Sequence, residues 1–261
     1  MRRRRVLALL ALVGMLLLSG CLGFFGDDSV PAERLDQEPA GDGYAWNESV
    51  DVHVTVRADS TFQGVYRVNG SELVLYRNDG LGGRNPLDVR AVRYRYPNGT
   101  VIDGSTLAER GSVRETRDEV TIRTPVAGGQ VAFTAESTPK RFVVPTYVEG
   151  SYEVVLPPDR DVSVPVFGRV SPGGAETRTD AQDRVHVTWD EVATDTVLVQ
   201  FYLERDLSLF GGLLAVFGAL AIVGVAYYRR QIRELRETRE EMGLDVDVGD
   251  DDGRDPPPGR R

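Results

Sequence analysis

The feature that most restricts the fold of this chain is an uncharged apolar run of 20 residues, Leu209 to Tyr228. At 1.5 Å per residue, a helix of this length spans the roughly 30 Å hydrocarbon layer of a bilayer. The sequence therefore predicts a single C-terminal transmembrane helix, which we place at residues 207–228.

Arginines gather directly behind this apolar run. They are Arg229, Arg230, Arg233, Arg236 and Arg239. Residues 204–206, in front of the run, carry no net positive charge, so the positive-inside rule places the C-terminus in the cytoplasm. The same arginines form a basic cluster that can contact anionic lipid headgroups.

The chain behind the apolar run is expected to continue as a helix before it becomes disordered. Arg230 and Glu234 are the first of three Arg/Glu pairs spaced four residues apart, a spacing that stabilises helices. We therefore expect a cytoplasmic juxtamembrane helix at residues 229–242. The acidic, proline-rich tail at residues 243–261 has too little apolar surface to fold and is expected to be disordered.

The N-terminus has the pattern of a lipoprotein export signal. Four arginines at positions 2–5 precede the apolar run Val6–Leu18, which leads into Leu18-Ser19-Gly20-Cys21. This order of basic, apolar and small residues is typical of a signal peptide rather than of a folded element. We expect residues 1–20 to be removed and Cys21 to carry lipid. The export route, general secretory or twin-arginine, is left open.

Between the two apolar runs the chain changes from a linker to β-structure. Residues 21–43 are rich in Gly, Asp, Glu and Pro and are expected to form a flexible tether. Valines then alternate with polar residues from Val50 to Val56, the pattern of a half-buried strand. Similar runs occur at residues 64–68, 72–77, 89–96, 119–124, 130–135, 141–144, 152–156, 162–167, 184–189 and 196–203.

These short strands favour a mainly β, sandwich-like fold. Asn and Gly between them, as in Asn78-Asp79-Gly80, supply the positive φ that hairpin turns need. No amphipathic helix is expected between Val50 and Leu203, so an immunoglobulin-like or similar sandwich is the favoured architecture. The β-rich extracytoplasmic region covers residues 44–206, as one unit or as two subdomains divided near residues 137–140.

Composition limits the partners of this region. The chain holds 40 acidic and 31 basic residues, a net charge of −9, so phosphate would be repelled and no nucleic-acid partner is expected. Lys140 is the only lysine, and this composition resembles that of proteins from salt-loving archaea, whose acidic surfaces are screened by salt. A GC-rich genome that favours Arg codons is the alternative explanation. Because the single cysteine is assigned to lipid, no thiol remains for a disulfide.

Three glycosylation sequons fall in turn-like sequence of the expected extracytoplasmic region. They begin at Asn47, Asn69 and Asn98. Each is an Asn-X-Ser/Thr acceptor to which a glycan can be attached on the exported side. Because such short motifs also arise by chance, the sequence leaves open which of them are used.

Histidine is too rare for the usual catalytic and metal sites. His53 and His186 are the only two, and each stands among alternating valines on the polar side of an expected strand. They could meet across a sheet and bind a metal, but neither has Cys, Asp or Glu at ligand spacing. We therefore expect solvated or edge-facing histidines, no catalytic residue, no metal and no cofactor. Scattered carboxylates leave a carboxylate-based hydrolase as the least favoured alternative.

Two further patterns have an ordinary structural explanation beside a functional one. Arginine and tyrosine alternate from Arg93 to Tyr96, as in a strip that binds sugars or polyanions, but a strand with one core face produces the same spacing. Gly211, Ala215 and Ala219 recur every four residues and would let two transmembrane helices pack closely. A homodimer through this helix is therefore left open.

Taken together, these features resemble a family of uncharacterised haloarchaeal membrane lipoproteins. The resemblance rests on Leu18-Ser19-Gly20-Cys21, the acidic β-rich middle, the junction Tyr202–Leu207 and the arginine-flanked helix. The family has no established activity, so the resemblance implies a location rather than a chemistry. Cys21 is the only functional residue that it assigns.

The sequence thus favours a non-enzymatic cell-surface lipoprotein, with its N-terminal region outside the cell membrane and its C-terminus in the cytoplasm. Its β-sandwich would bind or organise envelope components, with membrane lipids, envelope proteins or surface glycans as partners. The main alternative is a single-pass signalling or assembly subunit that couples ectodomain binding to residues 229–242. An envelope hydrolase is the third.

Overall fold

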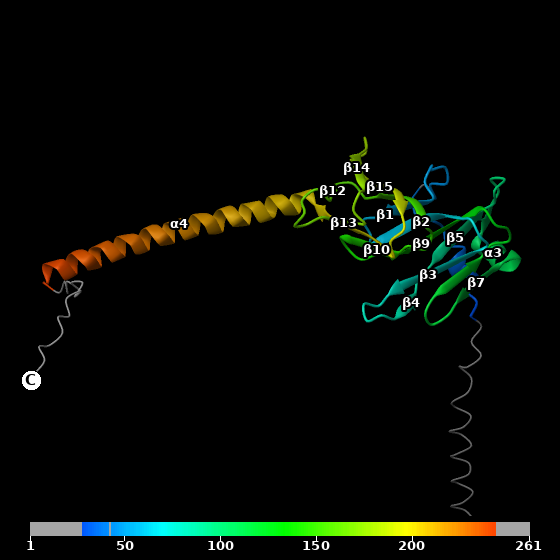
Figure 1. The fold of residues 1–261 in the computed structure, drawn as a ribbon, viewed down its shortest axis with the longest axis horizontal. Helices are drawn as coiled ribbons and strands as arrows, with labels where there is room; N and C mark the ends of the chain where they lie inside the picture. The colour runs from blue at the N-terminus through cyan, green and yellow to red at the C-terminus, as the bar shows by residue number, and fades with distance from the viewer. Residues whose placement is uncertain (1–27, 42, 244–261) are drawn as a thin grey trace, which may run out of the picture. The chain divides into compact units, whose positions relative to one another are not determined.

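A computed structural model describes residues 28–41 and 43–243. Their internal contacts divide them into a β-rich unit that ends at Glu204 and a second unit that begins at Arg205. Strands β1 to β17 and two short helices form the first unit, and α4 (Glu204–Glu241) accounts for the second (Figure 1). The prediction of a mainly β region followed by one C-terminal apolar helix is confirmed.

An eight-stranded sheet is the centre of the β unit. Its order is β14-β15-β11-β1-β2-β9-β5-β6, and all neighbouring strands are antiparallel except β1 and β11, which are parallel. The strands are β14 (Glu176–Thr179), β15 (Val185–Val192), β11 (Gly150–Val155), β1 (Val52–Val56), β2 (Thr61–Val68), β9 (Gly129–Glu136), β5 (Arg90–Arg95) and β6 (Val101–Asp103). Strands from both sides of residues 137–140 share this sheet, so that segment connects parts of one unit.

Two smaller sheets supply the second layer. One has the order β10-β16-β13 and the other the order β4-β3-β8-β7. Their strands are β10 (Arg141–Pro145), β16 (Thr196–Gln200), β13 (Arg169–Ser171), β4 (Arg84–Pro86), β3 (Glu72–Asn78), β8 (Val120–Arg123) and β7 (Ser112–Glu115). A separate pair is formed by β12 (Arg160–Asp161) and β17 (Tyr202–Leu203), the last strand before α4.

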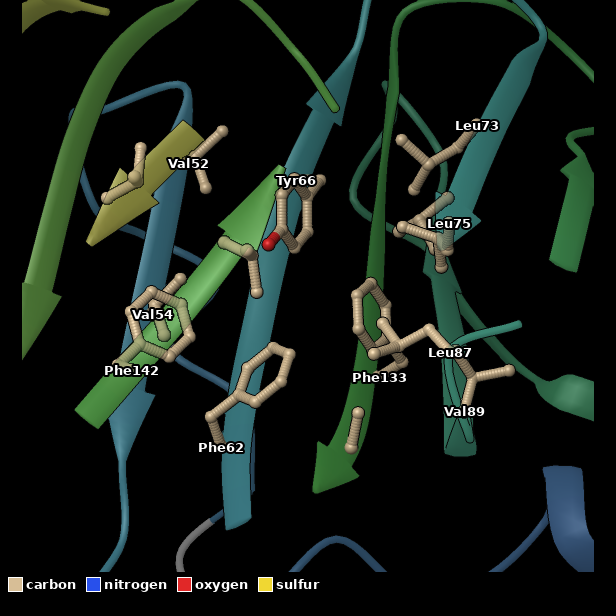
Figure 2. Packing of buried hydrophobic residues seen from close by; sticks show 14 of the residues in the cluster. Val52, Val54, Phe62, Tyr66, Leu73, Leu75, Leu87, Val89, Phe133 and Phe142 are labelled. Atoms are coloured by element: carbon tan, nitrogen blue, oxygen red, sulfur yellow. The ribbon is translucent and has the colours of Figure 1, made fainter. Parts of the chain in front are cut away.

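The core lies between the large sheet and the two smaller ones (Figure 2). The ring centroids of Phe62 on β2 and Phe142 on β10 are 5.2 Å apart, which joins the layers. Tyr66 on β2 stacks on Phe133 of β9 at 5.3 Å, and the fully buried Leu75 of β3 faces the same space. Apolar residues at every second strand position therefore build a two-layered sandwich.

Residues 28–41, predicted as part of a flexible tether, belong to the fold. Val30 and Leu35 are buried, the latter completely, and α2 (Ala32–Leu35) packs beside β5. The backbone N–H of Val30 donates to the carbonyl of Val113 on β7 at 3.4 Å. The prediction was wrong because two apolar residues create no periodicity, yet they suffice to fill a gap in a core that other strands build. Residues 21–27 and 42 of the predicted tether lie outside the described residues.

A short helix also departs from the prediction of an all-strand region. α3 (Gly104–Arg110) begins behind Asp103, whose carboxylate accepts a backbone N–H of the first turn at 2.8 Å as an N-cap. Its Leu107 is fully buried, and a Cβ atom on Gly104 would come within 2.7 Å of the Leu35 Cβ. One buried leucine in so short a helix leaves no helical periodicity to detect.

Residues 162–167, predicted as a strand, form none. The Asp161 carboxylate accepts from the backbone N–H groups of Val162 at 2.6 Å and Ser163 at 3.0 Å, which bends the chain into a turn. Pro165 follows and has no N–H to donate to a ladder. The other predicted strands are present with shifted ends. Short strands that the sequence pattern did not reveal are β4, β6, β7, β12, β13 and β14.

Helix α4 is long and apolar enough to cross a membrane. The candidate span covers Glu204–Arg239, 36 residues, and apolar side chains such as Leu213 and Ile222 are exposed along it. The helix continues without a break from the apolar run to Glu241, through most of the predicted juxtamembrane helix. All five arginines of the basic cluster are exposed on it. The tail from residue 244 onward lies outside the described residues.

The packing of Leu35 leads to a testable prediction. Leu35→Ala removes a fully buried side chain, and substitutions of this kind usually cost about 2–5 kcal/mol. We expect the free energy of unfolding of the full chain, measured by chemical denaturation, to fall by about that amount. Leu81→Ala is the control, because Leu81 is 95% exposed and its truncation should change the free energy by less than about 0.5 kcal/mol. Equal stability of both variants would contradict the inclusion of residues 28–41 in the fold.

Candidate functional site

Polar residues form a row across the face of the eight-stranded sheet that lies opposite the core. The register places His53 on β1 between Glu153 on β11 and Val65 on β2. Because side chains alternate along a strand, His53 points away from the core face to which Val52 and Val54 belong. The sheet thus joins a histidine and a glutamate that are 100 positions apart in the sequence.

His186 joins this group from the next strand. It stands opposite Val155 on β11, diagonal to Glu153, and Arg178 on the edge strand β14 is in register with it. His53, Glu153 and His186 are only 7%, 6% and 8% exposed. The expectation of solvated histidines is therefore wrong, because the partners that bury them come from distant parts of the chain.

The Glu153 carboxylate is the hub of the network. Its Oε2 lies 3.1 Å from Nδ1 of His53, and its Oε1 lies 2.7 Å from Nδ1 of His186. Arg178 donates from Nη2 to the same Oε1 at 2.8 Å. Both carboxylate oxygens thus have partners, as a buried charge requires.

Beyond the hub, the network reaches a hydroxyl at one end and a second carboxylate at the other. Thr55 Oγ1 lies 3.3 Å from Nε2 of His53, and Asp180 Oδ2 lies 3.0 Å from Nε2 of His186. Arg184 donates from Nε to Asp180 at 2.8 Å. The network therefore runs from Thr55 to Arg184 through two imidazoles and two carboxylates.

These contacts constrain where the ring hydrogens lie. A hydrogen on Nδ1 of His53 satisfies Glu153, while Nε2 accepts from the Thr55 hydroxyl. His186 has two competing partners at one ring nitrogen. Its Nε2 lies 3.0 Å from Asp180, and its Nδ1 lies 2.7 Å from the Glu153 carboxylate and 3.0 Å from Nη2 of Arg178. A hydrogen on Nδ1 donates to Glu153, whereas a bare Nδ1 accepts from Arg178. The position of the His186 hydrogens therefore decides which of these two bonds Nδ1 makes.

Burial and hydrogen bonding shift the pKa values of the network in defined directions. Burial lowers the pKa of His53, and the opposing charges of Glu153 and Glu48 do not cancel this effect. Burial raises the pKa of Glu153, but hydrogen bonds and charge from His186 and His53 outweigh it, so that this pKa lies below its usual value. Desolvation raises the pKa of Asp180, but the hydrogen bonds from His186, Arg184 and Gln182 together outweigh it, so that this pKa lies below its usual value.

The N-terminal segment lies across the same face of the sheet. Gln63 on β2 donates to the carbonyl of Ala40 at 2.8 Å, and the Tyr44 hydroxyl donates to the carbonyl of Ala91 at 2.5 Å. Further along this segment, Glu48 comes close to the network. One ligand atom each from Glu48, His53 and Glu153 lies within 4.8 Å of the other two, and of these three residues only Glu48 is exposed.

The chemistry open to this group follows from its burial. Thr55, His53 and Glu153 stand in the order hydroxyl, imidazole, carboxylate, which in hydrolases activates a nucleophile. Here the side chains of the imidazole and the carboxylate are 9% and 8% exposed, so a substrate has little access to them. The arrangement is better suited to holding a cation than to attacking a substrate.

The sequons and the lipidation residue fall outside this network. Asn47, Asn69 and Asn98 are exposed, and Asn47 Oδ1 accepts from Arg95 at 2.9 Å. Their use as glycan acceptors stays a prediction. Cys21 lies outside the described residues.

The alternating arginines and tyrosines have the ordinary structural role. Arg93 donates to the carbonyl of Gln37 at 3.1 Å and Arg95 to the carbonyl of Trp46 at 3.0 Å, so both hold the N-terminal segment. Tyr94, between them, points to the other face and is fully buried. The spacing is that of a strand with two different faces.

Sequence reasoning singled out both histidines but missed Glu153 and Asp180, their carboxylate partners. One signal was present, because Glu153 is the only charged residue in the apolar run Tyr152–Leu156. A charge in such a run predicts a buried polar partner. Nothing in the sequence says that the partner is a histidine on β1, since the pairing of β1 with β11 is long-range.

The lowered pKa of His53 predicts that stability depends on pH. Unfolding restores the ordinary pKa near 6.5, so below about pH 7 the unfolded chain binds more protons than the folded chain and the free energy of unfolding decreases. One proton contributes at most about 1.4 kcal/mol per pH unit.

His53→Gln cannot titrate and should flatten the decrease in the free energy of unfolding between about pH 7 and 5, measured by chemical denaturation with chelator present. The carboxyls of Glu153 and Asp180 lose their stabilising contribution only at more acidic pH. Equal slopes for wild type and variant would contradict the prediction.

The comparisons with known proteins identify a family for this chain but no activity. No curated protein matches it. A protein family of unknown function, DUF5803, matches residues 48–247, which is most of the chain. The match begins at Glu48 and contains every strand of the β unit together with α4. The chain therefore belongs to the DUF5803 family of unknown function.

Proposed function

We propose that this protein is a non-enzymatic lipoprotein of the cell membrane whose β unit lies outside the cell and binds or organises envelope components. The observation that carries the proposal is the junction between the β unit and α4. Helix α4 is long and apolar enough to cross a bilayer, and it follows β17 without a linker. A folded unit joined in this way is held at the membrane surface.

Charge and the N-terminal pattern support this orientation. The basic cluster lies behind the apolar run of α4, which by the positive-inside rule favours a cytoplasmic C-terminus. The N-terminal pattern of arginines, apolar residues and Leu18-Ser19-Gly20-Cys21 supports export of the region in between. The two signals agree, since both leave the β unit outside.

Lipid on Cys21 would add a second attachment close to the fold. The carbonyl of Asp28 accepts from the backbone N–H of Glu115 on β7 at 2.7 Å, so the chain is held by β7 from Asp28 onward. The segment from Cys21 to Asp28 can span at most about 25 Å. One lipid chain binds membranes only marginally, whereas a spanning helix is effectively permanent. The lipid would therefore orient the β7 edge toward the bilayer rather than retain the protein.

Composition and surface features support an envelope setting. The acidic, lysine-poor composition is that of proteins that work in concentrated salt, which is the basis for proposing a haloarchaeal source. The three sequon asparagines are exposed, so attached glycans would not disturb the core. Envelope proteins and surface glycans are the partners that this setting offers.

The topology can be tested on the protein purified from native membranes. We expect an intact mass that begins at lipid-modified Cys21, and external protease on whole cells should remove the β unit while sparing residues behind the apolar run. Cys21→Ser is the matched variant, because it removes the lipid but leaves α4. It should stay in the membrane and change only the rate at which protease cuts near Asp28. A mature protein that retains Met1, or a β unit protected in whole cells, would contradict the proposal.

A signalling or assembly role is the second candidate, and the continuity of α4 favours it. The helix extends from Glu204 to Glu241 without a break, past the apolar run and through the basic cluster. A continuous helix can transmit a change at the β unit to the cytoplasmic side, which a flexible linker cannot.

Truncation of the cytoplasmic part separates the two candidates. Deleting residues 233–261 removes most of the juxtamembrane helix, and deleting only residues 244–261 is the control. If the protein couples the β unit to the cytoplasm, the longer deletion should abolish co-purification of partners or the cellular phenotype at normal surface abundance, while the shorter one should not. No difference between the deletions would leave α4 as an anchor.

A further inference from the structure

We propose that Glu48, His53 and Glu153 form a binding site for a divalent transition-metal ion, with Zn²⁺ as the best fit. One ligand atom from each residue lies within 4.8 Å of the other two. An imidazole and two carboxylates are a ligand set that zinc uses in proteins, with water at the remaining position. The inference does not depend on the membrane topology.

The two buried ligands already have the spacing of neighbours around one ion. Nδ1 of His53 and Oε2 of Glu153 are 3.1 Å apart. Two ligands bound to zinc at about 2.0–2.1 Å in tetrahedral geometry are about 3.3 Å apart. An ion can therefore take the place of the hydrogen between them after a small shift. Glu48, which is exposed and precedes β1, is the ligand that closes over the ion.

The neighbours of these ligands are arranged as outer partners of a metal site. Oε1 of Glu153 is occupied by Nδ1 of His186 at 2.7 Å, which leaves Oε2 for the ion. Nε2 of His53 lies 3.3 Å from the Thr55 hydroxyl. Metal-binding histidines usually donate their other ring N–H to such a group, which fixes the tautomer and the ring orientation.

Metal binding requires a defined change in the position of one proton. Without metal, the hydrogen on Nδ1 of His53 faces Glu153, and Nε2 accepts from Thr55. With metal on Nδ1, the hydrogen must lie on Nε2, where Thr55 Oγ1 accepts it. The number of protons on the neutral ring is unchanged. The tautomer of His53 therefore indicates directly whether a metal ion is bound to Nδ1.

The surrounding charges favour a divalent cation. Glu48 and Glu153 contribute two negative charges, whereas the charge of Asp180, at the far side of His186, is balanced by Arg184. Arg178 is the main opposing charge, because its Nη2 contacts the hub carboxylate directly. Its side chain is 61% exposed, so the guanidinium can turn into water when the ion neutralises Glu153.

The ligand types select among divalent ions. Calcium prefers six to eight oxygen ligands, and magnesium keeps most of its own water. A buried imidazole nitrogen beside two carboxylates suits zinc and its neighbours among the transition metals better. We therefore expect Ca²⁺ to be a poor competitor for the site.

The test is a Zn²⁺ titration of the full chain in detergent, purified without a histidine tag and stripped with chelator. We expect one tightest site per chain, weakened at least about tenfold by His53→Gln and by Glu48→Gln, since each removes one of three ligands. Glu48 is exposed, so a loss of Zn²⁺ affinity in Glu48→Gln cannot be ascribed to misfolding. The substitution also keeps the glycosylation sequon that begins at Asn47. Glu176→Gln is the matched control, because it removes an exposed carboxylate from the neighbouring edge strand β14 and should leave affinity unchanged.

Two further readouts distinguish a metal site from a structural network. Arg178→Gln should raise Zn²⁺ affinity about threefold or more, because it removes the opposing charge. The ¹⁵N NMR shifts of His53 should show the hydrogen move from Nδ1 to Nε2 when Zn²⁺ is added and return when it is chelated. Equal Zn²⁺ binding by wild type, His53→Gln and Glu48→Gln, or an unchanged His53 tautomer at saturating Zn²⁺, would overturn the assignment.

Discussion

The parallel pairing of β1 with β11 holds the two parts of the β unit together. On one side of this seam are β2, β9, β5 and β6, and on the other are β15 and β14. Four residue pairs, from Val52 with Tyr152 to Thr55 with Val155, make the junction. One of them is His53 with Glu153. The large sheet and the polar network therefore depend on the same ladder.

The buried carboxylate at this seam contributes more to specificity than to stability. A buried ion pair gains little over apolar residues of the same size, whereas removing one partner costs about 3–5 kcal/mol because the other charge stays buried. A shift of β11 by one residue would turn Glu153 into the apolar core between the sheets, away from His53 and His186. The same shift would bring Tyr152 and Val154 out of the core. The polar network thus favours the register of β1 with β11 that pairs His53 with Glu153.

The sequence predicts the elements of this protein well and their long-range neighbours poorly. Alternating valines revealed β1, and the uncharged run revealed α4, because each pattern is local. The contact of His53 with Glu153 has no local signal, since it comes from a parallel pairing of distant strands. Leu35 was missed for a related reason. It fills a cavity that other strands create, and nothing beside it in the sequence marks it as buried.

The junction before α4 has a mechanical consequence. β17, next to the helix, is held to β12 by two residue pairs, whereas β16 is held to β10 by five and to β13 by three. Tension applied through α4 acts first on the pairing of β17 with β12 and only then on β16. Phe201 to Leu203 would therefore peel away under load, lengthening the connection by a few residues while the sandwich stays intact. Under tension applied through α4, the end of the β unit would therefore yield before the seam between β1 and β11.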